Sequence, residues 1–202
     1  MNYFYLIRHA QKQNLKGDPD LSELGIKQVH FTTDYLRKFP IKSIYSSSLL
    51  RAKQTAEYIA KSFNLKVIIE KNLNERINWG DDPELSFEEF LKLWERTSLD
   101  RKFKPKVGDS SYKAGERLRD VIENISKEND NSHIVLVTHG GIIVDFLRNI
   151  FSEGLLRKFK SDFFEEREKL IKECSITIVK KNRSNFFLEE LASIDHLPFL
   201  IE

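Results

Sequence analysis

The feature that most constrains the fold is a regular alternation of short apolar runs with longer stretches of helical periodicity. Six runs rich in branched and aromatic residues have strand character: 3–7, 42–46, 65–70, 133–139, 175–181 and 186–192. Five stretches have helical spacing: 22–39, 48–63, 87–97, 114–129 and 141–156. Strands that alternate with helices form βαβ units. We therefore predict an α/β fold, a three-layer α/β/α sandwich around a mostly parallel, doubly wound sheet.

The length of 202 residues suits a single domain spanning 1–202. Two charged stretches depart from the strand–helix pattern. We expect 78–113, which holds two of the five prolines, to form a lid or insert with one short helix. We expect 152–173 to be a second excursion of amphipathic helical character.

Composition excludes several classes of function. A net charge of +2, from 33 basic and 31 acidic residues, gives no general affinity for nucleic acid or an anionic membrane. No apolar stretch approaches the roughly 20 residues that cross a bilayer. The one cysteine, Cys174, excludes an internal disulfide and a multi-cysteine zinc site, and we expect it to be a small buried side chain. A strand that begins by residue 3 leaves no room for a signal peptide, so we expect a cytoplasmic protein.

Four groups of reactive or charged side chains stand near the ends of predicted strands. They are Arg8 with His9 after the first strand, Arg51 in the helix after the second, Glu75 beyond the third, and His139 with Gly140 and Gly141 after the fourth. Carboxyl ends of parallel strands meet at one edge of a sheet, where ligands of open α/β sheets bind. We therefore expect one shared site, in which the two glycines let backbone N–H groups approach an anion.

These residue types suit phosphoryl transfer. Arginine binds phosphate oxygens with two parallel hydrogen bonds, which holds both the substrate and the charge that develops during transfer. A neutral histidine is a competent nucleophile, and a carboxyl group can protonate a leaving alcohol.

Five segments in this order resemble the histidine phosphatase superfamily, which includes the cofactor-dependent phosphoglycerate mutases. They are "LIRHAQ", "DLSELGIKQ", "IYSSSLLRAKQTAEYIA", "LNERINWG" and "VTHGG". The resemblance covers nearly the whole chain and is weakest in 78–107 and 152–173. It implies a three-layer α/β/α fold, a phosphohistidine intermediate, and neither metal nor cofactor.

The resemblance also implies roles for individual residues. His9 would be the nucleophile and Glu75 the proton donor, while Arg8, Arg51 and His139 would complete the phosphate pocket. The remaining predicted substrate-binding residues are Gly140, Asn14 and Ser22. "GDSS" (108–111) resembles the Gly-Glu-Ser of the family, with Arg117 at the position of a following arginine, and "IDHL" (194–197) resembles a late structural segment.

Each residue also has an ordinary structural interpretation. His139 could be a hydrogen-bonded core histidine, Arg51 a solvated helix residue, and Glu75 half of a weak surface pair with Arg76. Ser22, with Asp20 and Gly25, fits turn and cap chemistry. We assign the other histidines, His30, His133 and His196, to structure.

Several positions depart from the family pattern. Ala10 stands where the family has glycine, and a φ above zero there would cost roughly 1 kcal/mol. Gln11-Lys12 replaces an acidic–hydroxyl pair, Asn14 lies one residue early, and Asp109 replaces a glutamate. The mutase clamp for glycerate often uses two adjacent arginines, whereas "WERTS" offers Arg96 alone. These changes favour a phosphatase over a mutase.

The leading prediction is therefore a phosphomonoester hydrolase that acts on a small phosphorylated metabolite. Two alternatives stay open: a phosphoglycerate mutase, and a non-catalytic phosphate-binding module. The sequence predicts neither nucleic acid nor membrane as a partner. It leaves the substrate and the assembly state open, with a homodimer among the alternatives.

Overall fold

The computed structural model describes residues 1–165 and 170–198. Within these residues six strands form one sheet in the order β3-β2-β4-β1-β5-β6. Their bounds are β1 (Asn2–Arg8), β2 (Ile41–Ser46), β3 (Val67–Ile69), β4 (His133–Thr138), β5 (Ile176–Lys181) and β6 (Phe186–Ser193). Strands β1 to β4 pair in parallel, and β5 and β6 add an antiparallel edge. The prediction of a mostly parallel sheet is confirmed.

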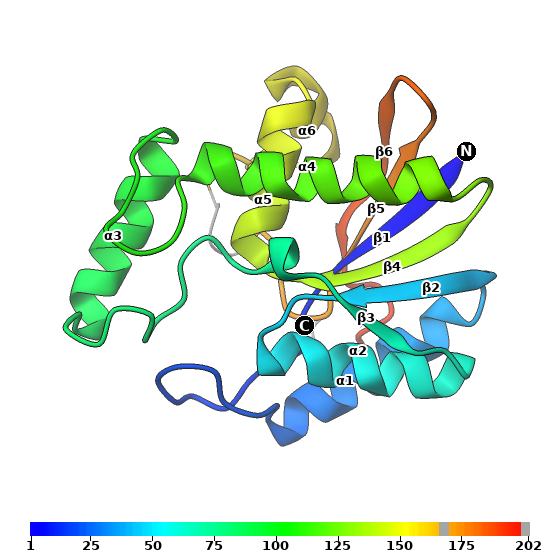
Figure 1. Cartoon of the computed structure of the whole chain (residues 1–202), viewed down its shortest axis with the longest axis horizontal. Helices are drawn as coiled ribbons and strands as arrows, with labels where there is room; N and C mark the ends of the chain where they lie inside the picture. The colour runs from blue at the N-terminus through cyan, green and yellow to red at the C-terminus, as the bar shows by residue number, and fades with distance from the viewer. Residues whose placement is uncertain (166–169, 199–202) are drawn as a thin grey trace.

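Helices cover both faces of the sheet, which confirms the predicted α/β/α arrangement (Figure 1). Helices α1 and α2 lie on one face, and α4 and α5 lie on the other. The bounds are α1 (Glu23–Leu36), α2 (Leu50–Phe63), α3 (Phe87–Leu99), α4 (Ser111–Glu128), α5 (Gly140–Ile150) and α6 (Glu153–Phe159), with a short 3₁₀ helix, η1 (Lys71–Leu73).

Strand β1 lies at the centre of two hydrophobic cores. Phe4 and Leu6 pack with α4 and α5, whereas Tyr5 and Ile7 pack with α1 and α2. Side chains of a strand alternate between faces, so a run that is apolar at every position must be covered on both sides. Each large side chain that is fully buried contributes about 1.5–3 kcal/mol. The central strand is therefore a rigid base for whatever follows Arg8.

Helix starts follow the local sequence, with two corrections. Ser22 caps α1 by accepting a hydrogen bond from the Gly25 amide at 3.0 Å. A serine cap would also be expected for α2, because Ser48 stands just before it, but Leu49 occupies the cap position and makes no side-chain bond. The predicted helix over 141–156 is two helices, because the backbone of Phe151 is extended and Ser152 caps α6.

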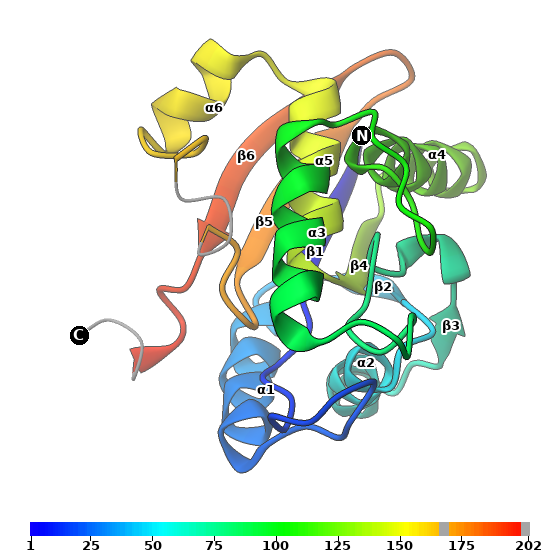
Figure 2. The same ribbon diagram turned by 90° about the vertical axis from the view of Figure 1, so that its left-hand side faces the viewer.

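The first excursion, 78–113, contains α3, whose capping box joins Ser86 and Glu89. Helix α3 stands beyond the carboxyl ends of the parallel strands, at the left of Figure 1 and in front in Figure 2. In the second, 152–173, the described residues 152–165 and 170–173 include the helix α6, whereas 161–165 form turns, so the prediction of amphipathic helix is wrong for 161–165. Residues 166–169 of that prediction lie outside the described residues.

No helix within the described part of the chain combines the length and the apolar character that crossing a membrane requires.

Two glycines allow a matched test of helix packing. A Cβ at Gly115 in α4 would lie 2.5 Å from the Asp145 carbonyl oxygen of α5, whereas a Cβ at Gly154 in α6 would meet nothing within 4 Å. Gly115→Ala should lower the free energy of unfolding by about 1–3 kcal/mol, because α4 and α5 must move apart. Gly154→Ala should raise it by about 0.4–1 kcal/mol. Urea unfolding measures both, and equal effects would contradict the close approach of α4 and α5.

Candidate active site

The register of the parallel strands brings the predicted site residues to one edge of the sheet. Arg8, the last residue of β1, pairs with Thr138 at the end of β4, and Ser46 of β2 pairs with Val137. The His9 amide continues this pairing by donating to the Thr138 carbonyl at 2.9 Å. His9 and His139, separated by 130 positions, therefore leave the sheet side by side, with ring centroids 5.1 Å apart.

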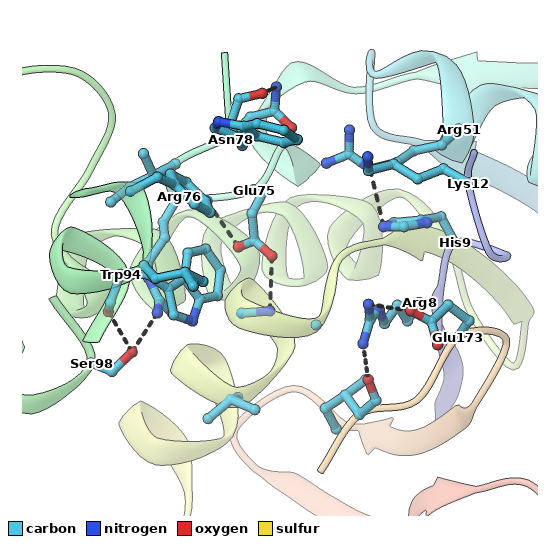
Figure 3. A pocket seen from close by; sticks show the side chains of 18 of the residues that line it. Arg8, His9, Lys12, Arg51, Glu75, Arg76, Asn78, Trp94, Ser98 and Glu173 are labelled. Carbon is cyan, nitrogen blue, oxygen red and sulfur yellow. Dashed lines mark hydrogen bonds and ion pairs between the residues drawn. The ribbon is translucent and has the colours of Figure 1, made fainter. Parts of the chain in front are cut away.

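Arg51 of α2 contacts both histidines, and Figure 3 shows its hydrogen bond to His9. Its Nε donates to Nε2 of His9 at 3.0 Å, and its Nη2 lies 3.3 Å from Nδ1 of His139. Nδ1 of His9 lies 2.7 Å from the Ala10 carbonyl, which only accepts. This pattern assigns the proton of His9 to Nδ1 and leaves a lone pair on Nε2. Only 4% of the Arg51 surface is exposed, so the interpretation as a solvated helix residue is wrong.

Residues that the sequence did not single out complete this network. Asp18 accepts a hydrogen bond from Nη1 of Arg51 at 3.1 Å. The Ser47 hydroxyl lies 2.7 Å from Nε2 of His139 and donates to the Asn74 side-chain oxygen at 3.0 Å. Asp18 lies in the turn-forming stretch "GDPD", and Ser47 lies in "YSSS" directly after a strand. These positions offered a weak signal, because both segments also fit ordinary turn chemistry.

Arg8 lies on the opposite side of His9 from Arg51 and is held by two hydrogen bonds (Figure 3). Its Nη1 donates to the Ile171 carbonyl at 2.6 Å, and its Nη2 donates to the Glu173 carboxylate. A guanidinium carries five N–H donors, so these two bonds leave others for a ligand. Glu173, which sequence reasoning missed, therefore fixes the orientation of Arg8 without using all of its donors.

Glu75 reaches the pocket from the loop after η1. Its carboxylate accepts from the Gly141 amide at 2.9 Å and from the Arg76 amide at 2.9 Å. The glycine amide at the start of α5 thus binds a carboxylate of the protein itself. A Cβ at Gly141 would lie 2.6 Å from a Glu75 oxygen and 2.6 Å from the Trp94 ring, so glycine is required for this close approach.

The predicted surface pair between Glu75 and Arg76 does not form. Arg76 is 3% exposed, pairs with Asp145 of α5 at 3.0 Å, and lies 3.7 Å from the centre of the Trp94 ring. Ser111 also donates to Asp145. Removing one partner of a buried ion pair is strongly destabilising, so this pair fixes the loop on which Glu75 stands.

The segment 108–111, which resembles the Gly-Glu-Ser of the family, helps to hold the loop that carries Glu75. Arg117 donates to Asp109 at 2.8 Å and to the carbonyls of Asn72 and Asn74 at 2.5 and 3.0 Å. Asp109 therefore works with Arg117 to hold the chain just before Glu75, and neither residue lines the main pocket.

A cavity of about 390 Å³ opens beside these groups. Asn14 and Gly140 line it, together with Arg8, His9, Arg51 and Glu75. Lys12, which the sequence singled out only as a departure, also lines it. Ser22 does not line it, because its hydroxyl caps α1 and donates to the Gln11 side chain at 2.6 Å. His139 does not line the cavity; it is buried beneath the lining residues, in contact with Arg51.

Ala10 is unstrained. It is not among the described residues with φ in the left-handed region, and its methyl group is buried in the core beside α1 and α2. The backbone strain that a positive φ at Ala10 would cause is therefore absent.

Burial lowers the pKa of His9 well below its ordinary value, and the charges of Arg51 and Arg8 lower it further. The pKa of His139 is lowered in the same way by burial, then by Arg51 and by His9. Both rings are therefore neutral near pH 7. Nε2 of His9 keeps its lone pair, as a nucleophile requires.

The other sequence-selected residues serve packing. His133 stacks on Tyr3 with ring centroids 4.4 Å apart, and His196 bonds Thr32 and the Cys174 carbonyl. Burial raises the pKa of Cys174 to about 12. In the described ranges, no cluster of three or more histidine, cysteine, aspartate or glutamate residues is arranged to hold a metal ion.

The fold and this arrangement define an α/β protein with two arginines and two histidines at the edge of a parallel sheet. Residues 4–193 match the profile of the histidine phosphatase superfamily, branch 1. The chain belongs to this superfamily, which confirms the resemblance of the sequence motifs.

Individual relatives agree with this assignment. The chain is 32% identical to a metal-independent phosphoserine phosphatase of Arabidopsis thaliana over 68% of this chain, and the match spans 64% of that relative. It is 32% identical to phosphoserine phosphatase 1 of Hydrogenobacter thermophilus, over 66% of this chain and 69% of the relative. The fold resembles that of Entamoeba histolytica phosphoserine phosphatase in complex with 3-phosphoglyceric acid, with a TM-score of 0.73, 23% identity, and coverage of 98% of this chain and 100% of that one.

The lowered pKa values predict a stability that depends on pH. Above about pH 6.5 both histidines are neutral in the native and the unfolded chain, so they do not lower the free energy of unfolding. Below that pH the unfolded chain binds protons that the native protein does not, and each histidine removes up to about 1.4 kcal/mol per pH unit until its native pKa is reached. Urea unfolding at pH 7.5, 6.5 and 5.5 should show this loss.

His139→Gln should flatten the loss of stability between pH 6.5 and 5.5, because one buried histidine is removed. His30→Gln, at an exposed position of α1, is the matched control and should leave the slope unchanged. Equal slopes in the original protein and in His139→Gln would contradict the assignment of a neutral His139.

Proposed function

We propose that this protein is a phosphomonoester hydrolase that acts on a small phosphorylated metabolite through a phosphohistidine intermediate. The observation that carries the proposal is the Nε2 lone pair of His9, which faces the Nε of Arg51 at 3.0 Å. A nucleophile beside a buried guanidinium is suited to attack a phosphoryl group that the same guanidinium binds.

In the first step, phosphate oxygens bind the free donors of Arg8 and Arg51. The Nε–H of Arg51 leaves Nε2 of His9 and turns to a phosphate oxygen, which frees the lone pair of Nε2. A bond then forms between Nε2 and phosphorus as the bond from phosphorus to the ester oxygen breaks. Glu75 gives its proton to the departing alcohol, which leaves as a neutral molecule. The proton of His9 stays on Nδ1, where the Ala10 carbonyl holds it.

In the second step, water enters where the alcohol left. The Glu75 carboxylate takes a proton from this water, which attacks phosphorus and breaks the bond to Nε2. Inorganic phosphate and a neutral His9 remain, and Glu75 carries the proton it needs for the next cycle. The balance of the two steps is one ester and one water converted into one alcohol and one phosphate.

The positive charge in this scheme comes from the protein. Arg8, Arg51 and a helix start at Gly140 surround the space beside His9, and arginines can neutralise charge on phosphoryl oxygens without a metal. The names of the Arabidopsis and Hydrogenobacter relatives support the reaction class. A cytoplasmic location completes the proposal, because small phosphorylated metabolites are substrates of the cell interior.

The mutase alternative is less favoured. Arg96, which the sequence offered as a clamp for glycerate, lies 3.7 Å from the centre of the Phe103 ring and is not among the residues that line the pocket. The non-catalytic alternative does not account for a nucleophile and a carboxylate that line one cavity.

The direct test is hydrolysis of p-nitrophenyl phosphate. The purified protein should turn over this substrate, and His9→Ala should lose essentially all activity while retaining its circular dichroism spectrum. His30→Ala, at an exposed histidine, is the matched control. Substantial hydrolysis by folded His9→Ala would remove His9 from the nucleophilic role, and no hydrolysis of any ester by the original protein would support the binding module.

Glu75→Gln should affect substrates according to their need for a proton. The amide keeps the size of the side chain but cannot donate the acid proton, and general acid catalysis contributes about 10²–10⁴-fold. An alkyl alcohol leaves poorly as its anion, whereas nitrophenolate leaves without help. The loss in kcat/KM should therefore be large for an alkyl phosphate and smaller for p-nitrophenyl phosphate.

This comparison requires that formation of the phosphoenzyme limits the rate. Absence of a burst of nitrophenol establishes that condition. Equal losses for both substrates under it would argue against Glu75 as the acid, and Asp81 and Asp82 on the same loop would be tested next.

Activity should not depend on a metal ion. Hydrolysis should persist after prolonged treatment with EDTA, and vanadate should inhibit because it mimics the phosphoryl oxygens. A loss of activity in EDTA that a divalent cation reverses would refute this part of the proposal.

A further inference from the structure

The side of the pocket opposite the phosphate-binding groups is formed by an apolar stripe on α3. Phe87, Phe90, Leu91 and Trp94 occur at positions i, i+3, i+4 and i+7, so they share one face of the helix, and all four line the cavity. Such a stripe normally packs onto a core. Here Phe87 and Leu91 are 52% and 43% exposed. The stripe therefore faces the cavity and remains partly uncovered.

The loop before α3 extends this apolar surface. Trp79 lines the same cavity, and the centroid of its ring lies 4.7 Å from the ring centroid of Phe87. The ring centroids of Phe90 and Trp94 lie 6.0 Å apart. We refer to Trp79 together with the four stripe residues of α3 as the aromatic wall.

Cationic groups on this side of the cavity already have partners. Arg76 is paired with Asp145 and covered by the Trp94 ring at 3.7 Å. Arg148 donates to the Ser98 carbonyl at 3.2 Å and lies 5.6 Å from the Phe164 ring. The Asp145 carboxylate therefore already neutralises the Arg76 guanidinium, and the stripe beside it offers a substrate apolar surface.

The aromatic wall adjoins the position of bond cleavage. A Cβ on Gly141 would lie 2.6 Å from both Glu75 and Trp94, so the carboxyl group and the indole ring meet over the same glycine. Figure 3 shows Trp94 on the opposite side of Glu75 from His9. An alcohol that takes a proton from Glu75 therefore has Trp94 as its neighbour.

We propose that the aromatic wall binds the leaving group, and that the preferred substrates are phosphomonoesters of alcohols bearing an apolar ring or chain. This inference rests on the proposed function and adds the substrate class. Covering the exposed parts of Phe87 and Leu91 removes apolar surface from water and stabilises the bound ester. The cavity of about 390 Å³ lies in the range of sites that bury ligands larger than a three-carbon phosphate.

The test compares two esters that differ only in the apolar group expected to contact the aromatic wall. 3-Phenylpropyl phosphate and n-propyl phosphate both release an unactivated primary alcohol, so the chemical step is matched. The kcat/KM for the phenylpropyl ester should be at least about tenfold higher. It should also exceed the values for phosphoserine and 3-phosphoglycerate, whose leaving groups carry a carboxylate.

Variants of α3 locate the effect. Phe87→Ala and Leu91→Ala should each reduce the ratio of the two kcat/KM values severalfold toward one. Leu99→Ala is the matched control, because Leu99 is on the same helix, is 63% exposed, and does not line the cavity. It should leave the ratio unchanged. An equal reduction in all three variants would assign the effect to the helix as a whole and overturn the role of the wall.

Calorimetric binding of the non-hydrolysable 3-phenylpropylphosphonate and propylphosphonate separates this inference from the proposed function. Tighter binding of the phenylpropyl compound without hydrolysis of any ester would refute the hydrolase and support the wall. Hydrolysis of both esters at similar kcat/KM, or a preference for phosphoserine, would overturn the inference while the hydrolase stands.

Discussion

The buried guanidinium of Arg51 is the interaction on which the rest of the site depends. A charge removed from water is tolerated only when hydrogen bonds and opposite charges surround it. Asp18 supplies the opposite charge, and the lone pairs of His9 and His139 accept two further donors. Burial already lowers the pKa of both histidines, and the charge of Arg51 lowers it further, because a protonated ring would repel the guanidinium. One helix residue thus reinforces the neutral state of two residues that follow neighbouring strands.

The meeting of Arg8, His9, Arg51 and His139 could be predicted from the sequence, because the carboxyl ends of parallel strands lie at one edge of the sheet. Strands β1 and β4 are apolar at nearly every position, which identifies central strands, and the residues after them must meet at one edge. Asp18 and Ser47 could not be predicted in the same way. They act through contacts with Arg51 and His139 in other elements, and their own surroundings fit a turn equally well.

Two predictions are wrong because a local pattern in the sequence determines neither the distant partner of a side chain nor the point where a helix ends. Arg76 follows Glu75, yet its side chain pairs with Asp145, 69 positions away. Asp145 did carry a signal, since it is a lone carboxylate in the apolar stretch "GIIVDFL". Similarly, apolar spacing continues beyond Ile150 and conceals the break at Phe151, although Ser152 is a good helix cap.

The two halves of the cavity are held by different parts of the fold. Arg8, His9 and His139 stand on or next to central strands, so sheet register fixes their positions, whereas the aromatic wall stands on an excursion between η1 and α4. Gly141 is where the halves touch, because Glu75 and Trp94 both approach it. In the proposed reaction, a change in the α3 side chains would therefore alter which alcohol fits, while the groups proposed to bind phosphate keep their geometry. A side chain at position 141 would instead displace Glu75 and Trp94 together, and so would disturb both the proposed protonation of the alcohol and its proposed binding.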